Sequence, residues 1–195
     1  QVNPPADRFP PKGKIKDIEV VAERTIELIT HIENFRKERG LPRIAYEVGT
    51  EEVHGGLADM SVFNKFLTLL KEGLEKNGCA DAWPCFVVGK VGTDLHTTFF
   101  DPVVAKQLTS TVAKYGSFIK GHYTDDVENP EEYPLTGMGA ANVGPEFTVA
   151  EYVALEELEG VENCLYDEGR VPMHSHMTAI LRRLVVESGR WKKWV

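Results

Sequence analysis

The sequence of 195 residues contains few cysteines, no long apolar run and no cluster of positive charge. Its three cysteines form no C-x-x-C pair and cannot all be bridged, which argues against a disulfide scaffold and for a reducing, cytoplasmic location. No apolar run approaches the roughly 18 to 20 residues that cross a bilayer. No signal-peptide pattern opens the chain either, so we expect no membrane partner.

Basic stripes and nucleotide-binding glycines are also missing. The formal net charge is −8, and the lysines and arginines are scattered, so no basic surface could follow a phosphodiester backbone. We therefore expect no nucleic-acid partner. The sequence has no G-x-x-x-x-G-K-[ST] loop, whose backbone amides would hold the phosphates of a nucleotide, and this argues against a sugar kinase.

Four segments share one plan, in which a β-branched strand runs into a loop of glycine, threonine, histidine and carboxylates, and a helical pattern follows. The strands are expected at 43–48, 85–91, 117–123 and 140–143. Because right-handed β/α crossovers place successive strands side by side, these strands should be parallel and adjacent in sequence order. A (β/α) barrel presents its active site at strand ends of this kind, so the layout predicts an enzyme.

Apolar periodicity and capping residues predict the helices between the strands. The segment NPEEYPLTGMG after the third strand carries two prolines and two glycines, so only one or two helical turns are expected there. Thr148 and Glu151 fit a capping box that would open a helix running to about 158. The expected longer helices begin after Asp17, near Met60, at Pro102, at Thr148 and near Ser175.

A complete eight-unit barrel needs about 250 residues, and four strand units account for half of one. The chain is therefore expected to be an α/β protein that supplies roughly the C-terminal half, strands 5 to 8, of a TIM (β/α)8 barrel. The opening at Gln1 and the proline-rich start fit a fragment or the mature portion of a longer product. We expect 1–16 to be a linker or extended connection, 17–160 the half barrel and 161–195 a helical tail. The other half would come from upstream residues or another chain, so an oligomer is expected.

Three histidines lie close to the ends of different predicted strands, at positions 54, 96 and 122. Strand ends converge at one face of a parallel barrel, so the three imidazoles could approach one another. Together with the nearby carboxylates of Glu51, Asp94 and Asp125, they would suit zinc, manganese or a related divalent ion. The alternative is that each histidine is a solvated loop residue. His122 is the strongest candidate because it directly follows the third strand.

Glu47 is a carboxylate inside an otherwise apolar strand, so it should be paired, metal-bound or raised in pKa. One alternative is a structural ion pair with Lys90 or Lys120, which lie within two other strand patterns. Glu51 lies beyond the strand end and is the better general base or metal ligand. After the fourth strand, V-G-P-E-F-T could offer the free backbone amides of a helix start to a phosphate or sugar oxygen, but the same turn is common where a strand leads into a helix.

Together and in order, the segments Y-E-V-G-T-E with a following G-G, G-H-Y-T-D and A-N-V-G-P-E-F-T resemble those of one family. It is the family of the non-catalytic subunit of class II tagatose-bisphosphate aldolase, formerly described as tagatose-6-phosphate kinase, and it includes ketohexose and ketohexose-phosphate 4-epimerases. The resemblance covers roughly residues 17–159 and implies the second half of a TIM barrel. The sequence departs from the family pattern at His54 and His96, and it lacks the family's H-L-G motif.

The resemblance implies a metal-dependent carbohydrate enzyme that acts on a tagatose-like or fructose-like ketose or ketose phosphate, as a 4-epimerase or an aldolase-type lyase. The alternative is a non-catalytic subunit that stabilises a class II tagatose-bisphosphate aldolase. A sugar or sugar phosphate would be the small-molecule partner, and zinc or manganese the cofactor. Residue reasoning and resemblance together give the expected site: catalytic Glu51, Asp125 and Lys90; metal ligands His122, Glu51, His54 and His96; substrate-binding Thr50, Gly144 and Thr148.

Overall fold

The computed structural model describes residues 17–49, 59–93 and 97–193 of the chain. The chain divides into two compact units, of which the first ends at Val143 and the second begins at Gly144. Within the described ranges, no helix is both long enough and apolar enough to span a membrane.

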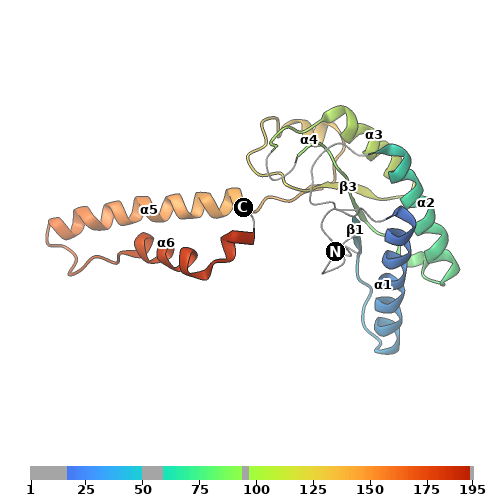
Figure 1. The fold of residues 1–195 in the computed structure, drawn as a ribbon, viewed down its shortest axis with the longest axis horizontal. Coiled ribbons are helices and arrows are strands. Elements are labelled where there is room, and N and C mark those ends of the chain that lie inside the picture. The colour runs from blue at the N-terminus through green and yellow to red at the C-terminus, as the bar shows by residue number, and fades with distance from the viewer. Residues whose placement is uncertain (1–16, 50–58, 94–96, 194–195) are drawn as a thin grey trace. The chain divides into compact units, whose positions relative to one another are not determined.

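The first unit is built on a four-stranded parallel sheet in the order β1-β2-β3-β4, which confirms the predicted strand order. Figure 1 labels β1 and β3 of this sheet. The strands are shorter than expected, but backbone hydrogen bonds continue past their ends. The amide of Cys85 donates to the carbonyl of Tyr46, and the amide of Gly89 donates to that of Lys120. The strands are β1 (Glu47–Gly49), β2 (Phe86–Val88), β3 (Phe118–Gly121) and β4 (Ala140–Ala141).

The register of the sheet separates an apolar face from a mixed face. Val48, Val87 and Ile119 are level with one another and belong to the buried core. Side chains alternate between the two faces of a strand, so the neighbouring residues Glu47, Phe118 and Lys120 point away from that core. Within the described part of the chain, β1 and β4 each pair with one neighbour only, and no closed barrel is formed.

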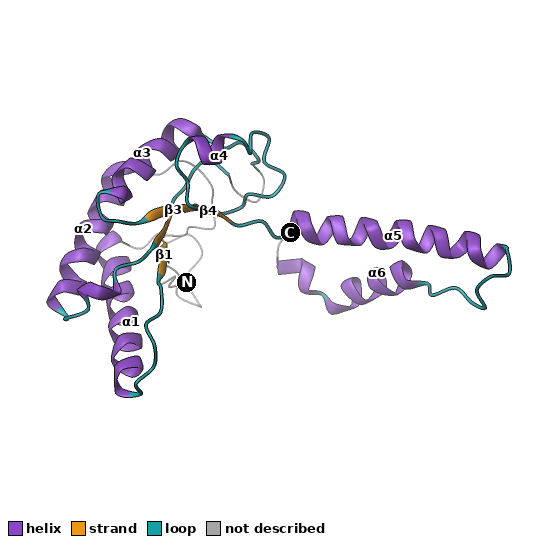
Figure 2. Cartoon of the chain, turned by 180° about the vertical axis from the view of Figure 1, so that it is seen from behind, coloured by secondary structure: helices purple, strands orange, loops and turns teal. Residues whose placement is uncertain are grey.

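Three helices cover the apolar face: α1 (Ile18–Glu38), α2 (Met60–Lys76) and α3 (Pro102–Ala113) (Figure 2). Asp17 precedes α1 as predicted. The carboxylates of Asp59 and Asp101 accept hydrogen bonds from the first backbone amides of α2 and α3. Such caps satisfy amides that have no partner within the helix. The helices therefore begin where the sequence places a short acidic side chain.

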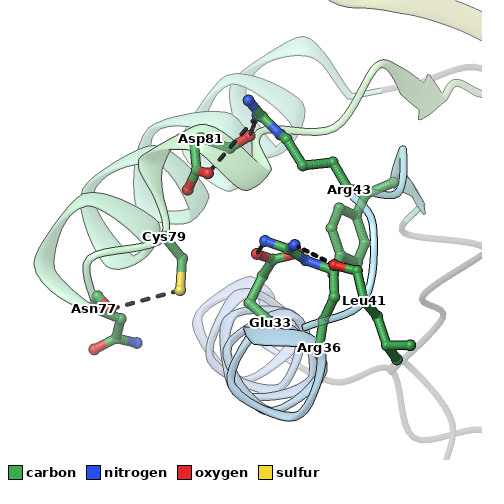
Figure 3. Close-up of polar contacts among 8 residues, drawn as sticks. Glu33, Arg36, Leu41, Arg43, Asn77, Cys79 and Asp81 are labelled. Atoms are coloured by element: carbon green, nitrogen blue, oxygen red, sulfur yellow. Dashed lines mark hydrogen bonds and ion pairs between the residues drawn. The ribbon is translucent and has the colours of Figure 1, made fainter. Parts of the chain in front are cut away.

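A buried polar network joins α1 to Tyr46, the residue before β1. Figure 3 shows Glu33, Arg36 and Leu41 of this network. Arg36 donates two hydrogen bonds to the carboxylate of Glu33, at 3.0 and 2.7 Å, and a third to the carbonyl of Leu41. The hydroxyl of Tyr46 donates to Glu33 at 2.8 Å. The Arg36 hydrogen bonds are the main cause that lowers the pKa of Glu33, and burial is the main cause that raises the pKa of Tyr46. The network fixes the direction in which the chain enters the sheet.

The connection between β3 and β4 contains one helical turn, α4 (Glu132–Leu135), as its prolines and glycines predicted. A 3-10 turn, η1 (Ala80–Ala82), precedes β2. The second unit consists of α5 (Pro145–Asp167), α6 (Met177–Ser188) and the 3-10 turn η2 (Arg190–Lys193).

The start and end of α5 differ from the prediction. The helix begins at Pro145 rather than at Thr148, because proline at the first helical position needs no hydrogen-bond acceptor for its nitrogen. The Thr148 hydroxyl lies 3.4 Å from the Gly144 carbonyl and forms no cap. The helix also continues through Gly160, so the expected domain boundary after residue 160 falls inside it.

Candidate functional site

Three polar side chains meet on the face of the sheet away from α1, α2 and α3: Glu47 is the first residue of β1, Lys120 lies within β3, and His122 follows the carboxyl end of β3. Nζ of Lys120 on β3 donates to Oε2 of Glu47 on β1 at 2.6 Å. Nε2 of His122, just after β3, lies 3.7 Å from Oε1 of Glu47. The side chains of Glu47, Lys120 and His122 are 16%, 17% and 10% exposed. We call these three residues the strand-end cluster.

Burial sets the electrostatics of this cluster. Burial disfavours the charged imidazolium and lowers the pKa of His122, while the charge of Glu47 opposes that shift. Oε1 of Glu47 is buried and accepts no hydrogen bond from the described residues. The cluster therefore combines the ion pair of Lys120 and Glu47 with a buried imidazole next to the Glu47 carboxylate.

Hydrogen bonds to neighbouring loops hold the loop that carries His122. The Thr93 hydroxyl, after β2, donates to the His122 carbonyl at 2.7 Å. The amide and hydroxyl of Thr124 both donate to the carbonyl of Asn142, after β4. Tyr123 has a positive φ of 55°, a conformation that costs energy for a residue with a Cβ. The surrounding contacts thus fix a strained loop beside the cluster.

Tyr133 on α4 lies next to Thr93, whose hydroxyl holds the His122 loop. Its ring stacks on that of Phe100 with centroids 4.0 Å apart. Burial raises the pKa of Tyr133 to about 12, and the Thr93 hydroxyl beside it opposes the rise. A Cβ on Gly121 would lie 3.3 Å from the Tyr133 ring, so glycine at the end of β3 gives the ring its space.

The predicted site residues fall into three groups. His122 and Asp125 lie on the loop after β3, and Lys90 lies two residues beyond β2, so these three share the strand-end side of the first unit. Gly144 and Thr148 belong to the second unit, where Gly144 precedes the first residue of α5. Thr50, Glu51, His54 and His96 lie outside the described residues.

The predicted metal site is not formed by the described side chains alone. Among them, no group of three or more histidine, cysteine or carboxylate side chains could hold an ion. Of the four predicted ligands only His122 is described, so the metal remains a prediction for this chain. His122 can coordinate through an imidazole nitrogen, as zinc and manganese sites require.

The pair of Glu47 with Lys120 is one of the two pairings that the sequence allowed. Thr93 and Tyr133 were not predicted as site residues. Thr93 stands in V-G-T-D directly after a strand, and this position could have indicated from the sequence that Thr93 belongs to the site. Tyr133 stands in a turn-rich segment, and nothing in the sequence relates it to His122.

The comparisons with known proteins show a fold likeness without a family match. No family model matches the sequence, and no curated protein matches it. The structure of a probable tagatose 6 phosphate kinase from Sinorhizobium meliloti 1021 superposes with a TM-score of 0.71 at 20% identity, over 94% of this chain and 46% of its own. A protein from Burkholderia cenocepacia J2315 named as a phosphonomutase gives a TM-score of 0.38 at 17% identity, over 83% of this chain and 54% of its own. The chain thus has the fold of one part of the Sinorhizobium protein and spans about half its length.

Proposed function

We propose that this chain belongs to an enzyme that acts on a ketose or ketose phosphate by aldol-type chemistry, as a 4-epimerase or an aldolase. The observation that carries the proposal is the strand-end cluster of Glu47, Lys120 and His122. His122 of this cluster follows the carboxyl end of β3, the end of parallel strands at which α/β folds commonly bind substrates, and this supports the proposal. The name of the Sinorhizobium protein, a tagatose 6 phosphate kinase, agrees with the sugar class. The sequence lacks a P-loop, so kinase chemistry is not proposed.

In the epimerase reaction, a carboxylate removes the proton of the 4-hydroxyl group, the bond between carbons 3 and 4 breaks, and the aldehyde adds again through its other face. Glu51 or Asp125 would accept this proton. Lys90 would place positive charge beside the enediolate. The aldolase reaction uses the same groups and differs by releasing the two fragments.

A zinc or manganese ion held by His122 with Glu51, His54 and His96 would supply polarisation of the ketone. Thr50 would contact the substrate near this site. The first backbone amides of α5, next to Gly144 and Thr148, would bind a phosphate or sugar oxygen, because such amides lack partners within the helix.

The remaining half of the barrel would come from upstream residues or from another chain. Phe118 supports this proposal, because it is 56% exposed on the face of the sheet that the described helices leave uncovered. The edge strands β1 and β4 support it too, since each has one described neighbour. A sheet with open edges and apolar side chains on an open face is prone to association.

The same exposed surface supports the alternative function, a non-catalytic subunit that stabilises a class II aldolase. The two functions differ in what His122 does. In the enzyme it binds an ion or the substrate, whereas in the subunit it would have no role in turnover.

The test is to exchange His122 for alanine and to measure interconversion of D-tagatose, D-fructose and their 6-phosphates together with the metal content of the protein. A loss on the order of 100-fold in turnover, with bound metal reduced and the circular dichroism spectrum unchanged, is expected for the enzyme. His31→Ala, at an exposed position on α1, is the matched control and should leave both unchanged. Full activity of His122→Ala would refute the role of His122. A metal-free wild-type chain that stabilises an aldolase but converts no ketose would establish the alternative.

A further inference from the structure

Two histidines of the second unit, His174 and His176, lie together in the turn between α5 and α6. Their ring centroids are 5.4 Å apart, and the ring planes are inclined by 32°. Two imidazoles that bind one tetrahedral zinc ion, each at about 2.0 to 2.1 Å, have ring centroids roughly 5 Å apart. The two rings therefore already have the separation of a pair of zinc ligands.

Contacts with α5 fix the position of the His174 ring. The Tyr166 ring packs against it with centroids 3.9 Å apart. Nδ1 of His174 lies 2.7 Å from Oδ1 of Asn163. Because an amide oxygen only accepts hydrogen bonds, Nδ1 carries the proton, and Nε2 of the neutral imidazole keeps its lone pair. Histidines that bind metal ions are commonly oriented in this way, through the ring nitrogen that does not bind the ion.

Ser175, which stands between the two histidines, is held by Glu162 of α5. Its backbone amide and its hydroxyl both donate to Oε2 of Glu162, at 3.0 and 2.7 Å. The hydrogen bonds from Ser175 are the main cause that lowers the pKa of Glu162, and the charges of His174 and His176 lower it further. A carboxylate charge therefore lies near both imidazoles, where it favours a bound cation.

We propose that His174 and His176 bind one zinc ion through imidazole nitrogens, with water molecules at its other positions. Among the described side chains, no group of three or more histidine, cysteine or carboxylate residues could hold an ion, so the site has two protein ligands. The ion would stabilise the hairpin of α5 and α6, because a ligand that binds only the folded state shifts the equilibrium toward it.

The competing explanation is that these contacts with α5 serve only to order the turn that leads into α6. His176 precedes α6 with a positive φ of 52°, a conformation that needs support from its surroundings. On this explanation, removal of either ring would weaken the hairpin without changing the affinity for zinc. The two explanations therefore differ in zinc binding and not in stability.

The experiment is a calorimetric titration of the untagged full chain with zinc chloride, with circular dichroism as the measure of folding. We expect His176→Ala to weaken one zinc site about 100-fold, and Asn163→Ala to weaken it about 10-fold, because Asn163 only orients His174. His31→Ala, at an exposed position on α1, is the matched control and should leave this site unchanged. His122→Ala should also leave it unchanged, which separates it from any ion bound in the first unit.

Chemical labelling of the wild type with diethyl pyrocarbonate tests the same site without any variant. The reagent acylates neutral imidazole nitrogens that bind no metal. Zinc should therefore protect the peptide that carries His174 and His176, while the labelling of His31 stays the same. Because the wild type is used, this result decides the question even where His176→Ala lowers the helix content.

Equal zinc affinities of His176→Ala and His31→Ala would overturn the proposal. Labelling of His174 and His176 that zinc does not change would overturn it too. Complete loss of zinc binding in His122→Ala would have the same meaning, because all of the bound zinc would then belong to the first unit.

Discussion

Removing one partner of the pair between Glu47 and Lys120 should cost far more stability than removing both. Losing one partner of a fully buried pair costs about 3 to 5 kcal/mol, because the other charge is left without compensation. The side chains of Lys120 and Glu47 are 17% and 16% exposed, so contact with water makes the cost of losing one partner smaller than in a fully buried pair. We expect Lys120→Met to lower the free energy of unfolding by about 2 to 4 kcal/mol.

The double variant Glu47→Gln with Lys120→Met leaves no buried charge in the pair. It should lie within about 1 kcal/mol of the wild type, since apolar and neutral replacements of buried pairs are often close to neutral. Lys65→Met is the matched single change at an exposed pair and should not alter stability measurably, because solvent screens such pairs.

Urea unfolding followed by circular dichroism measures these differences. With an m value of about 1.5 kcal/mol per M, the Lys120→Met midpoint should fall by roughly 1 to 3 M, and the m value itself should stay constant. A Lys120→Met midpoint equal to that of Lys65→Met would show that the pair is solvated. A double variant as unstable as Lys120→Met would show that the lysine stem, not charge compensation, stabilises the sheet.

Two further predictions concern the helices. A Cβ on Gly73 would collide with Cδ1 of Ile26 and lie 2.8 Å from its Cγ1, so Gly73→Ala should destabilise the first unit by about 1 to 2 kcal/mol in urea unfolding despite the higher helix propensity of alanine. At Gly160 nothing lies within 4 Å, so Gly160→Ala should instead raise helicity, and equal effects at the two sites would contradict the packing of α1 on α2. Because Arg36 holds the pKa of Glu33 below its usual 4.5, the stability from this group is present above pH 4.5 and is lost as the pH falls through the lowered pKa. Wild type should therefore lose stability in acid more steeply than Glu33→Gln, and parallel pH profiles would show that Glu33 does not titrate on unfolding.

Much of the first unit could be predicted from the sequence because local signals and burial agree there. Asp17 and Asp101 stand immediately before apolar residues at helical spacing, and both precede helices in the structure. The strands are short apolar runs between such helices. Because a helix between two strands forms a crossover connection, the strands are expected to pair in parallel and in sequence order, as they do in the structure. At α5 two signals conflicted, and Pro145 proved a better marker of the helix start than the capping box at Thr148.

The cluster was harder to predict because it depends on register. Lys90 and Lys120 occupy similar positions in their strand patterns, and sequence spacing does not say which one reaches Glu47. In the structure Lys120 is two residues beyond the β3 position that is level with Glu47, whereas Lys90 lies past the end of β2. The contact of Thr93 with the His122 carbonyl depends likewise on how two loops converge, which no local pattern encodes.

The two helices of the second unit meet through polar side chains rather than through an apolar core. The side of α5 that meets α6 is polar: Glu156 pairs with Arg182, and Glu159 accepts a hydrogen bond from Thr178. Phe147, Leu158 and Val161 are exposed, and at 100° per residue they lie on the opposite side of α5. Neither helix has a buried residue, so the hairpin gains little from apolar burial of its own. The second unit thus carries an exposed apolar stripe on α5, and exposed apolar surface of this kind is typical of interaction sites.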